Sequence, residues 1–137
     1  MQEIADRCGF SEQDCVIEMG AGRGRTAFFL ATVYGCRVIA YEKVPLFAQK
    51  GRELGIQKVQ WREEDMFEAD LSEATAIYLY GTMFSEMEVR KVAAAIQKIP
   101  RHVTIISVSE PLPGFSIEQS FEGRFPWGTT DIYIQRT

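Results

Sequence analysis

The sequence contains little of the material that metal sites and disulfide frameworks require. It has three cysteines without Cys-x-x-Cys spacing and a single histidine, His102. A sparse, odd set of cysteines argues against a disulfide scaffold and against a zinc site. One histidine leaves no material for a His-rich metal centre. We therefore expect no metal ion and a reducing, cytoplasmic environment.

Three further features are missing. No apolar run approaches the ~20 residues that a membrane-spanning helix needs, and the N-terminus shows no signal-peptide pattern. There is also no basic excess, because 15 Lys and Arg residues face 19 Asp and Glu residues and the net charge is −4. A nucleic-acid binder normally presents a basic face. These absences disfavour a membrane or nucleic-acid partner.

Apolar runs of strand length alternate with helical patterns along the 137 residues, which predict one domain over 1–137. The expected strands are 15–19, 36–41, 57–61, 75–80, 103–108, 115–121 and 131–135. The expected helices are 1–8, 25–34, 45–54 and one that starts at a Ser85-x-x-Glu88 capping box and stops before Pro100. The first five strands are mostly continuously apolar, as parallel strands covered on both faces are.

This pattern predicts an α/β three-layer sandwich. Its sheet has seven strands and is mostly parallel, with an antiparallel C-terminal strand. The last two strands are expected to pair at the sheet edge, joined by a loop that contains Gly123, Pro126, Trp127 and Gly128.

The residues best suited to bind a ligand are concentrated where the first strand ends. Glu18-x-Gly20-x-Gly22-x-Gly24 stands there, and a helix follows the glycines. Glycine allows positive φ and close approach of a ligand to the backbone, and a helix start presents unpaired N–H groups. Because ligands of open α/β sheets bind at the carboxyl edge of the strands, we expect a ligand beside these glycines.

Acidic residues follow the next two strands. Glu42 stands at the end of the second strand, where an acid accepts both hydroxyl groups of a ribose. Glu64, Asp65 and Met66 follow the third strand, where a carboxylate can accept from an adenine amine while Met66 offers an N–H and an apolar face. The three strand ends together predict one crevice for an adenosine.

The spacing discriminates among adenosine compounds. A dinucleotide fold would carry Gly-x-Gly-x-x-Gly or Ala, but Arg25 occupies the third position. Glu18, before the first glycine, disfavours a pyrophosphate and suits a ligand tail with an ammonium and a sulfonium. No Walker-type Gly-Lys-Ser/Thr occurs.

The Glu18-x-Gly20-x-Gly22-x-Gly24 motif, Glu42 and Asp65 together resemble the class I, Rossmann-like S-adenosylmethionine-dependent methyltransferases, and so does the final strand pair. The resemblance covers nearly the whole chain and implies S-adenosyl-L-methionine as cofactor. It implies these cofactor-binding residues: Glu18, Met19, Gly20, Ala21, Gly22, Glu42, Lys43, Glu64, Asp65, Met66, Tyr80 and Gly81.

The chain departs from the fuller members of that family. Residues 67–74 are too few for a proper helix, the 109–114 link has no helix, and little precedes the first strand. This trimmed layout is similar to the small protein-lysine methyltransferases. In addition, Tyr80-Gly81-Thr82-Met83 stands where methyltransferases of adenine, cytosine or glutamine carry Asp/Asn-Pro-Pro-Tyr/Phe. We therefore expect N-methylation of a protein lysine.

The candidates for the acceptor side are aromatic residues and one acid. Aromatic faces favour a cationic sulfonium and a methylated amine, and the chain offers Tyr80, Phe84, Phe125 and Trp127. Glu110, just past the fifth strand, is placed to attract a basic substrate or to accept a proton. Tyr80 and Glu110 are the predicted catalytic residues.

Other interpretations stay open at this level. The acceptor is a small molecule in one of them. In another, the chain is a non-catalytic S-adenosylmethionine-binding module that needs a partner chain. A nicotinamide-dependent oxidoreductase is disfavoured by Arg25 and the glycine spacing. An exposed aromatic loop on a core without a lid is also compatible with a homo-oligomer.

Overall fold

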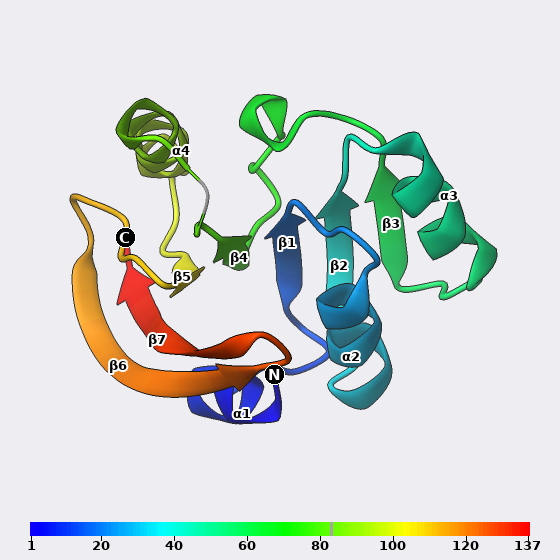
Figure 1. Ribbon diagram of the computed structural model, residues 1–137, viewed down its shortest axis with the longest axis horizontal. Coiled ribbons are helices and arrows are strands. Elements are labelled where there is room, and N and C mark those ends of the chain that lie inside the picture. Colours follow the sequence, from blue (N-terminus) through cyan, green and yellow to red (C-terminus); the bar gives the residue numbers. More distant parts are fainter. Residues whose placement is uncertain (83) are drawn as a thin grey trace.

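The computed structural model describes residues 1–82 and 84–137 (Figure 1). Met83, which closes the 80–83 stretch discussed above, lies outside the described residues. One seven-stranded sheet has the order β3-β2-β1-β4-β5-β7-β6. Its strands are β1 (Cys15–Met19), β2 (Arg37–Tyr41), β3 (Val59–Arg62), β4 (Ala76–Tyr80), β5 (Thr104–Val108), β6 (Ser116–Phe125) and β7 (Gly128–Arg136).

The directions of the strands confirm the predicted α/β sheet. β1 to β5 pair in parallel, and β7 runs antiparallel to both of its neighbours, β5 and β6. Because β1 and β4 lie side by side in the middle, the chain reverses its direction of growth there, and the carboxyl ends of β1, β2 and β4 meet at one edge. Ligand sites of such sheets lie at this switch point.

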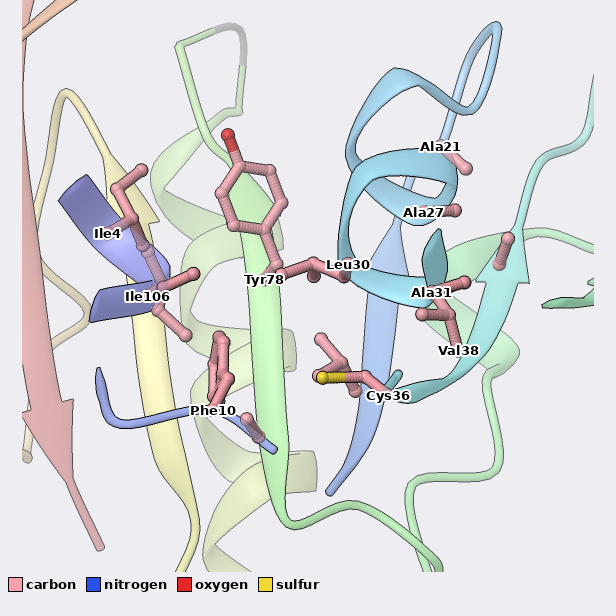
Figure 2. Packing of buried hydrophobic residues seen from close by; sticks show 14 of the residues in the cluster. Ile4, Phe10, Ala21, Ala27, Leu30, Ala31, Cys36, Val38, Tyr78 and Ile106 are labelled. Carbon is pink, nitrogen blue, oxygen red and sulfur yellow. The ribbon is translucent and has the colours of Figure 1, made fainter. Parts of the chain in front are cut away.

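Helices cover both faces of the sheet. The helices are α1 (Gln2–Cys8), α2 (Arg25–Val33), α3 (Pro45–Glu53), η1 (Met66–Glu68, a 3₁₀ turn) and α4 (Glu86–Gln97). α1 and α2 pack on one face through Ile4 and Leu30, in a cluster with Val38, Tyr78 and Ile106 (Figure 2). α4 and η1 lie on the opposite face, where Val92 and Ile96 pack against strand residues. The result is three layers.

Burial on both faces of the sheet explains why the central strands are almost continuously apolar. All five residues of β1 are buried, so successive side chains, which point to opposite faces, enter the two clusters in turn. Val16 joins the cluster under α1 and α2, and Ile17 joins the cluster under α4. The continuous apolar run is therefore the mark of a strand with helices on both sides.

The N-terminus of α4 has the predicted capping chemistry. In α4, Glu88 N–H donates to Ser85 Oγ at 3.3 Å, and Ser85 N–H donates to Glu88 Oε2 at 2.8 Å, which completes the predicted capping box. The shortened connections are also confirmed. Between β3 and β4 the chain forms only η1, and residues 109–114 contain no helix.

The loop between the last two strands is smaller than predicted. Gly123 lies inside β6, paired with Thr130, and the turn is formed by Pro126 and Trp127 between the paired residues Phe125 and Gly128. The reason lies across the strand pair: a Cβ on Gly123 would come 2.2 Å from Ile132 Cδ1. This glycine therefore makes room for a neighbouring side chain rather than for a turn. In the described part of the chain, no helix is long and apolar enough to span a membrane.

Candidate functional site

The glycines after β1 form a tight loop at the ends of β1 and β2. Gly20, Gly22 and Gly24 have positive φ values of 79°, 54° and 70°, a region that residues with a side chain rarely adopt. The N–H groups of Gly20 and Ala21 both donate to the carbonyl oxygen of Tyr41, at 3.0 and 2.9 Å. These two hydrogen bonds fix the loop to the carboxyl end of β2.

Gly24 has a packing role. It is the N-cap of α2, and a Cβ at this position would lie 2.5 Å from the ring atoms Cη2 and Cζ2 of Trp61. The indole of Trp61, from β3, therefore occupies the space that the missing side chain leaves. Because Gly24, the last glycine of the motif, has no side chain, the Trp61 ring of β3 can pack directly against the loop.

Glu42 is held by two backbone groups. Its Oε2 accepts from Gly22 N at 2.7 Å and its Oε1 accepts from Val44 N at 2.8 Å, and the residue is 8% exposed. Each carboxylate oxygen has two acceptor sites, so one on each oxygen remains for a ligand. A fixed carboxylate with two free acceptor sites suits a pair of neighbouring hydroxyl groups.

Asp65 and Met66 line the same cavity as Glu42. Asp65 Oδ1 accepts from Phe67 N at 3.0 Å as the cap of η1, and its Oδ2 lies 3.9 Å from Lys43 Nζ. Met66 lies against Gly20, where a Cβ would be 3.3 Å from the Met66 sulfur. A cavity of about 140 Å³ is lined by Gly20, Tyr41, Glu42, Lys43, Asp65 and Met66.

Glu18 ends β1 as a buried acid. It is 4% exposed, and its Oε2 accepts from Ala27 N, in the first turn of α2, at 3.0 Å. Burial raises the pKa of Glu18 to about 8; hydrogen bonds from Thr26 and Ala27 oppose that shift, and the charge of Glu42 adds to it. A carboxyl group with this pKa is ready to ionise when a cation approaches.

Glu18 lines a second, larger cavity of about 600 Å³. Its walls come from the loop and the start of α2, from β4, from the hairpin of β6 and β7, and from α1. The lining residues are Met1, Glu3, Ile4, Glu18, Gly20, Ala21, Arg25, Thr26, Tyr78, Tyr80, Phe121, Glu122, Gly123, Arg124, Phe125, Pro126 and Ile132. Gly20 lines both cavities, so they meet at the first glycine of the loop.

Three of the four predicted aromatic residues form one cluster, of which Tyr80 and Phe125 line the larger cavity and Trp127 is 55% exposed outside it. The ring of Tyr80 meets those of Phe125 and Trp127 edge-on at 5.8 and 5.9 Å, and Phe125 stacks on Trp127 at 5.3 Å. Burial raises the pKa of Tyr80. Phe84 lies elsewhere: it packs on Phe67 at 5.6 Å, in the cluster under α4.

The structure does not bring every predicted residue to a cavity. Met19 is buried in the cluster under α4, and Glu64 and Glu110 are exposed. None of these three lines either cavity, and neither do Gly22 and Gly81. Gly22 acts through its N–H on Glu42. Burial, then Asp131 and then Glu110 raise the pKa of Tyr133, so Glu110 lies near that residue. Tyr133 alternates with the cavity residue Ile132 and so faces the other side of the sheet.

Sequence reasoning missed several residues that line the larger cavity. Tyr78 precedes Tyr80 by two positions, and the period of a strand places both on one face, so this signal was present. Thr26 stands beside Arg25 at the start of α2. Met1, Glu3 and Ile4 reach the cavity because α1 packs beside the distant strand β6, where the Arg7 guanidinium lies 4.2 Å from the centre of the Phe121 ring. Among the described residues no group of three or more His, Cys, Asp or Glu side chains is arranged to hold a metal ion.

Solved structures share this fold. An RNA methyltransferase from Salinibacter ruber, in complex with S-adenosyl-L-homocysteine, matches with a TM-score of 0.79 and 21% identity over 98% of this chain and 86% of that chain. A variant of the protein MtNAS in complex with S-adenosylmethionine matches with a TM-score of 0.79 and 18% identity over 98% of this chain and 59% of that chain. Geranyl diphosphate C-methyltransferase from Streptomyces coelicolor, in complex with Mg²⁺, geranyl diphosphate and S-adenosyl-L-homocysteine, matches with a TM-score of 0.62 and 21% identity over 78% of this chain and 44% of that chain.

These likenesses, all below 25% identity, define the class of fold. The chain has the Rossmann-like fold of the class I S-adenosylmethionine-dependent methyltransferases. It spans less than two thirds of the MtNAS and geranyl diphosphate C-methyltransferase chains. No protein-family model and no curated protein sequence matches it.

Proposed function

We propose that this protein binds S-adenosyl-L-methionine and transfers its methyl group to an amine. The observation that carries the proposal is the place of Gly20, which lines both the cavity of about 140 Å³ and the cavity of about 600 Å³. The smaller cavity has the groups that an adenosine needs. The larger one has a buried carboxyl group for an ammonium and an aromatic cluster beyond it. A ligand with an adenosine at one end and an amino acid at the other fits this pair of cavities.

Each end of the ligand has its own residues. Glu42 binds the ribose hydroxyl groups through its two remaining acceptor sites, and Asp65 and Met66 contact the adenine. Glu18 faces the ammonium of the methionine moiety. The N–H groups at the start of α2 lie beside the carboxylate of the methionine moiety. When bound, S-adenosylmethionine supplies an electrophilic methyl group on a cationic sulfur.

The acceptor enters over the aromatic cluster of Tyr80, Phe125 and Trp127. We propose that it is the side chain of a protein lysine. A lysine amine must lose its proton to expose a lone pair, and burial near a positive sulfonium lowers its pKa. Aromatic faces stabilise the cationic product. Tyr80, whose ring is in the cluster and whose residue lines the cavity, is the candidate for contact with the amine. The position of Glu110 gives no support to a catalytic role for it.

A small-molecule acceptor is the second candidate. It is favoured by Met1, Glu3 and Ile4, which add a further wall to the larger cavity, because a cavity with walls on several sides admits a small molecule more readily than a folded protein surface. Both acceptors use the same cofactor site and differ only at the aromatic end.

Titration calorimetry tests the cofactor. We expect wild-type protein to bind S-adenosylmethionine and S-adenosylhomocysteine in the micromolar range, about −8 kcal/mol. Glu42→Ala should abolish binding, because it removes the ribose acceptor and releases the Gly22 and Val44 N–H groups. Glu12→Ala, an exposed acid before β1 at the amino edge of the sheet, is the matched control and should bind as wild type does. Failure of the wild type to bind either ligand refutes the proposal.

Transfer of a labelled methyl group tests the acceptor. Lysine-containing peptides and a panel of small amines are incubated with the protein and labelled S-adenosylmethionine. Label on peptide lysine supports the first candidate, and label on small amines alone supports the second. Tight cofactor binding without any transfer identifies instead a binding module that needs a partner chain.

A further inference from the structure

Tyr78 and Glu18 lie next to each other at the methionine end of the larger cavity. They are partners in the parallel register of β4 and β1, and both line the cavity together with Thr26. Tyr78 is 5% exposed and Glu18 is 4% exposed. A buried hydroxyl group and a buried carboxyl group therefore share one corner of the cavity wall.

The hydroxyl group of Tyr78 is a polar group on a ring that packs among apolar side chains. Figure 2 shows the ring on β4 between Ile106 and Leu30, with its oxygen directed away from Phe10 and toward the level of Ala21 and Ala27. Burying a hydroxyl group costs free energy unless it forms a hydrogen bond. Phenylalanine would serve the packing of this cluster equally well. The hydroxyl group therefore needs a reason outside the apolar core.

Thr26 lines the same corner of the cavity as the side chains of Glu18 and Tyr78, and its neighbour Ala27 donates its N–H to Glu18 Oε2 at 3.0 Å. Burial, and then the charge of Glu18, raise the pKa of Tyr78. The Tyr78 hydroxyl group therefore keeps its proton and is available as a hydrogen-bond donor. Glu18 is held from α2 on one side and bordered by β4 on the other.

We propose that Tyr78 is a positioning residue, whose hydroxyl group, together with that of Thr26, holds the Glu18 carboxylate toward the ammonium of the methionine moiety. The inference rests on the proposed function, since it requires S-adenosylmethionine to bind with its amino-acid end in the larger cavity. It assigns Tyr78 to one end of that ligand only. The adenosine end depends on the other cavity, which Tyr78 does not line.

A pair of ligands tests this division. S-adenosylhomocysteine has both ends, whereas 5′-deoxy-5′-methylthioadenosine has the adenosine and the thioether but no amino-acid end. In Tyr78→Phe we expect the Kd of S-adenosylhomocysteine to rise about tenfold, the effect of one lost hydrogen bond to a charged group. The Kd of methylthioadenosine should be unchanged. Tyr133→Phe, on the other face of the sheet, should change neither value.

Thr26→Val is a second, independent variant, and it should show the same selective loss. Thermal unfolding of each variant checks that it is folded. The inference is overturned if Tyr78→Phe weakens both ligands equally, or weakens neither. If wild-type protein binds neither ligand, the proposed function fails and the inference fails with it. Binding by the wild type without a selective loss in Tyr78→Phe overturns the inference alone.

Discussion

The indole of Trp61 occupies the space in which Gly51 would carry a side chain. A Cβ on Gly51, inside α3, would lie 2.0 Å from Trp61 Cζ2. Glycine in a helix interior costs about 1 kcal/mol relative to alanine, so its presence in α3 needs a reason. The same ring fills the space beside Gly24. Trp61 therefore ties α3 to the glycine loop of the candidate cofactor site.

Gly51→Ala should accordingly destabilise the protein, against helix propensity. Overpacking costs about 1–3 kcal/mol, which exceeds the gain from alanine. Denaturant unfolding measures the free energy. In a Trp61→Leu background the same substitution should become neutral or stabilising, so the two changes should be strongly non-additive. Additive effects would show that the ring does not set this position.

The raised pKa of Glu18 predicts that the free energy of unfolding depends on pH. Its pKa is raised from 4.5 to about 8 in the folded chain, so the folded state favours the protonated form. The stabilisation is fully present below pH 4.5 and is lost as pH rises toward 8, by about 1.4 kcal/mol per pH unit at most. Thr26, Ala27, Tyr78 and Glu42 are the groups that border it. Glu18→Gln should remove this slope, so its stability should fall less than that of the wild type between pH 5 and 8.

Glu18 also predicts a pH dependence of binding with the opposite sign. A cationic ammonium favours the ionised carboxylate, so binding releases a proton from Glu18 below pH 8. The affinity for S-adenosylhomocysteine should rise with pH up to about 8 in the wild type. Glu18→Gln should bind more weakly and should lack this rise, and comparison of the two proteins cancels the titration of the ligand itself. Parallel pH profiles for both proteins would contradict the assignment.

Trp127 predicts a selective defect on the acceptor side. Its side chain is in the aromatic cluster, away from the smaller cavity. Trp127→Ala should raise the KM for the methyl acceptor several-fold, the size of one cation–π contact, and leave the Kd of S-adenosylmethionine unchanged. Steady-state kinetics and calorimetry separate the two quantities. Met87→Ala, at an exposed position on α4, is the control. An equal loss of cofactor affinity would place Trp127 in another role.

The side chain of Gln135 stabilises the segment after β5, which contains no helix. This residue of β7 is fully buried. Its Nε2 donates to the carbonyl oxygens of Leu112 and Phe115 at 2.9 and 3.2 Å, and its Oε1 accepts from Leu112 N at 2.8 Å. Gln135→Ala leaves these backbone groups buried without partners, which costs about 1–3 kcal/mol each at most. The unfolding free energy should fall by about 3 kcal/mol, while Gln119→Ala, at an exposed position on β6, should change it little.

Five residues of the smaller cavity were predictable from the sequence because each follows its strand within a few positions, whereas Tyr41, the last residue of β2, was not predicted. Gly20 follows β1, Glu42 follows β2 and Asp65 follows β3 within a few residues. Parallel strands with right-handed connections place such positions at one edge of the sheet. The five predicted residues that line this cavity need no further information than strand order along the chain. Glu64 does not line this cavity, because adjacent residues on an extended segment point in different directions, and its contact with the cofactor stays a prediction.

The larger cavity could not be predicted in the same way. Phe125 ends β6 and Trp127 lies in the hairpin turn, both more than 40 residues after Tyr80 (125 − 80), and no local pattern predicts that these three rings meet. Their contact depends on β7 inserting between β5 and β6. The surroundings of Glu110 depend in the same way on distant parts of the chain, because Tyr133, whose pKa is raised by burial, by Asp131 and also by Glu110, is placed beside β5 by the pairing of β7.

The sequence by itself determined the alternation of strands and helices, the glycine loop and the acids that follow β1, β2 and β3. These features rest on backbone preferences and on the periodicity of burial, both of which act over a few residues. Only the tertiary structure decided which side chains line the larger cavity. Strand pairing and helix packing between distant parts of the chain bring together Met1, Ile4 of α1, Tyr78 of β4 and Phe125 of β6. Such contacts are fixed by the packing of the whole core rather than by any single segment.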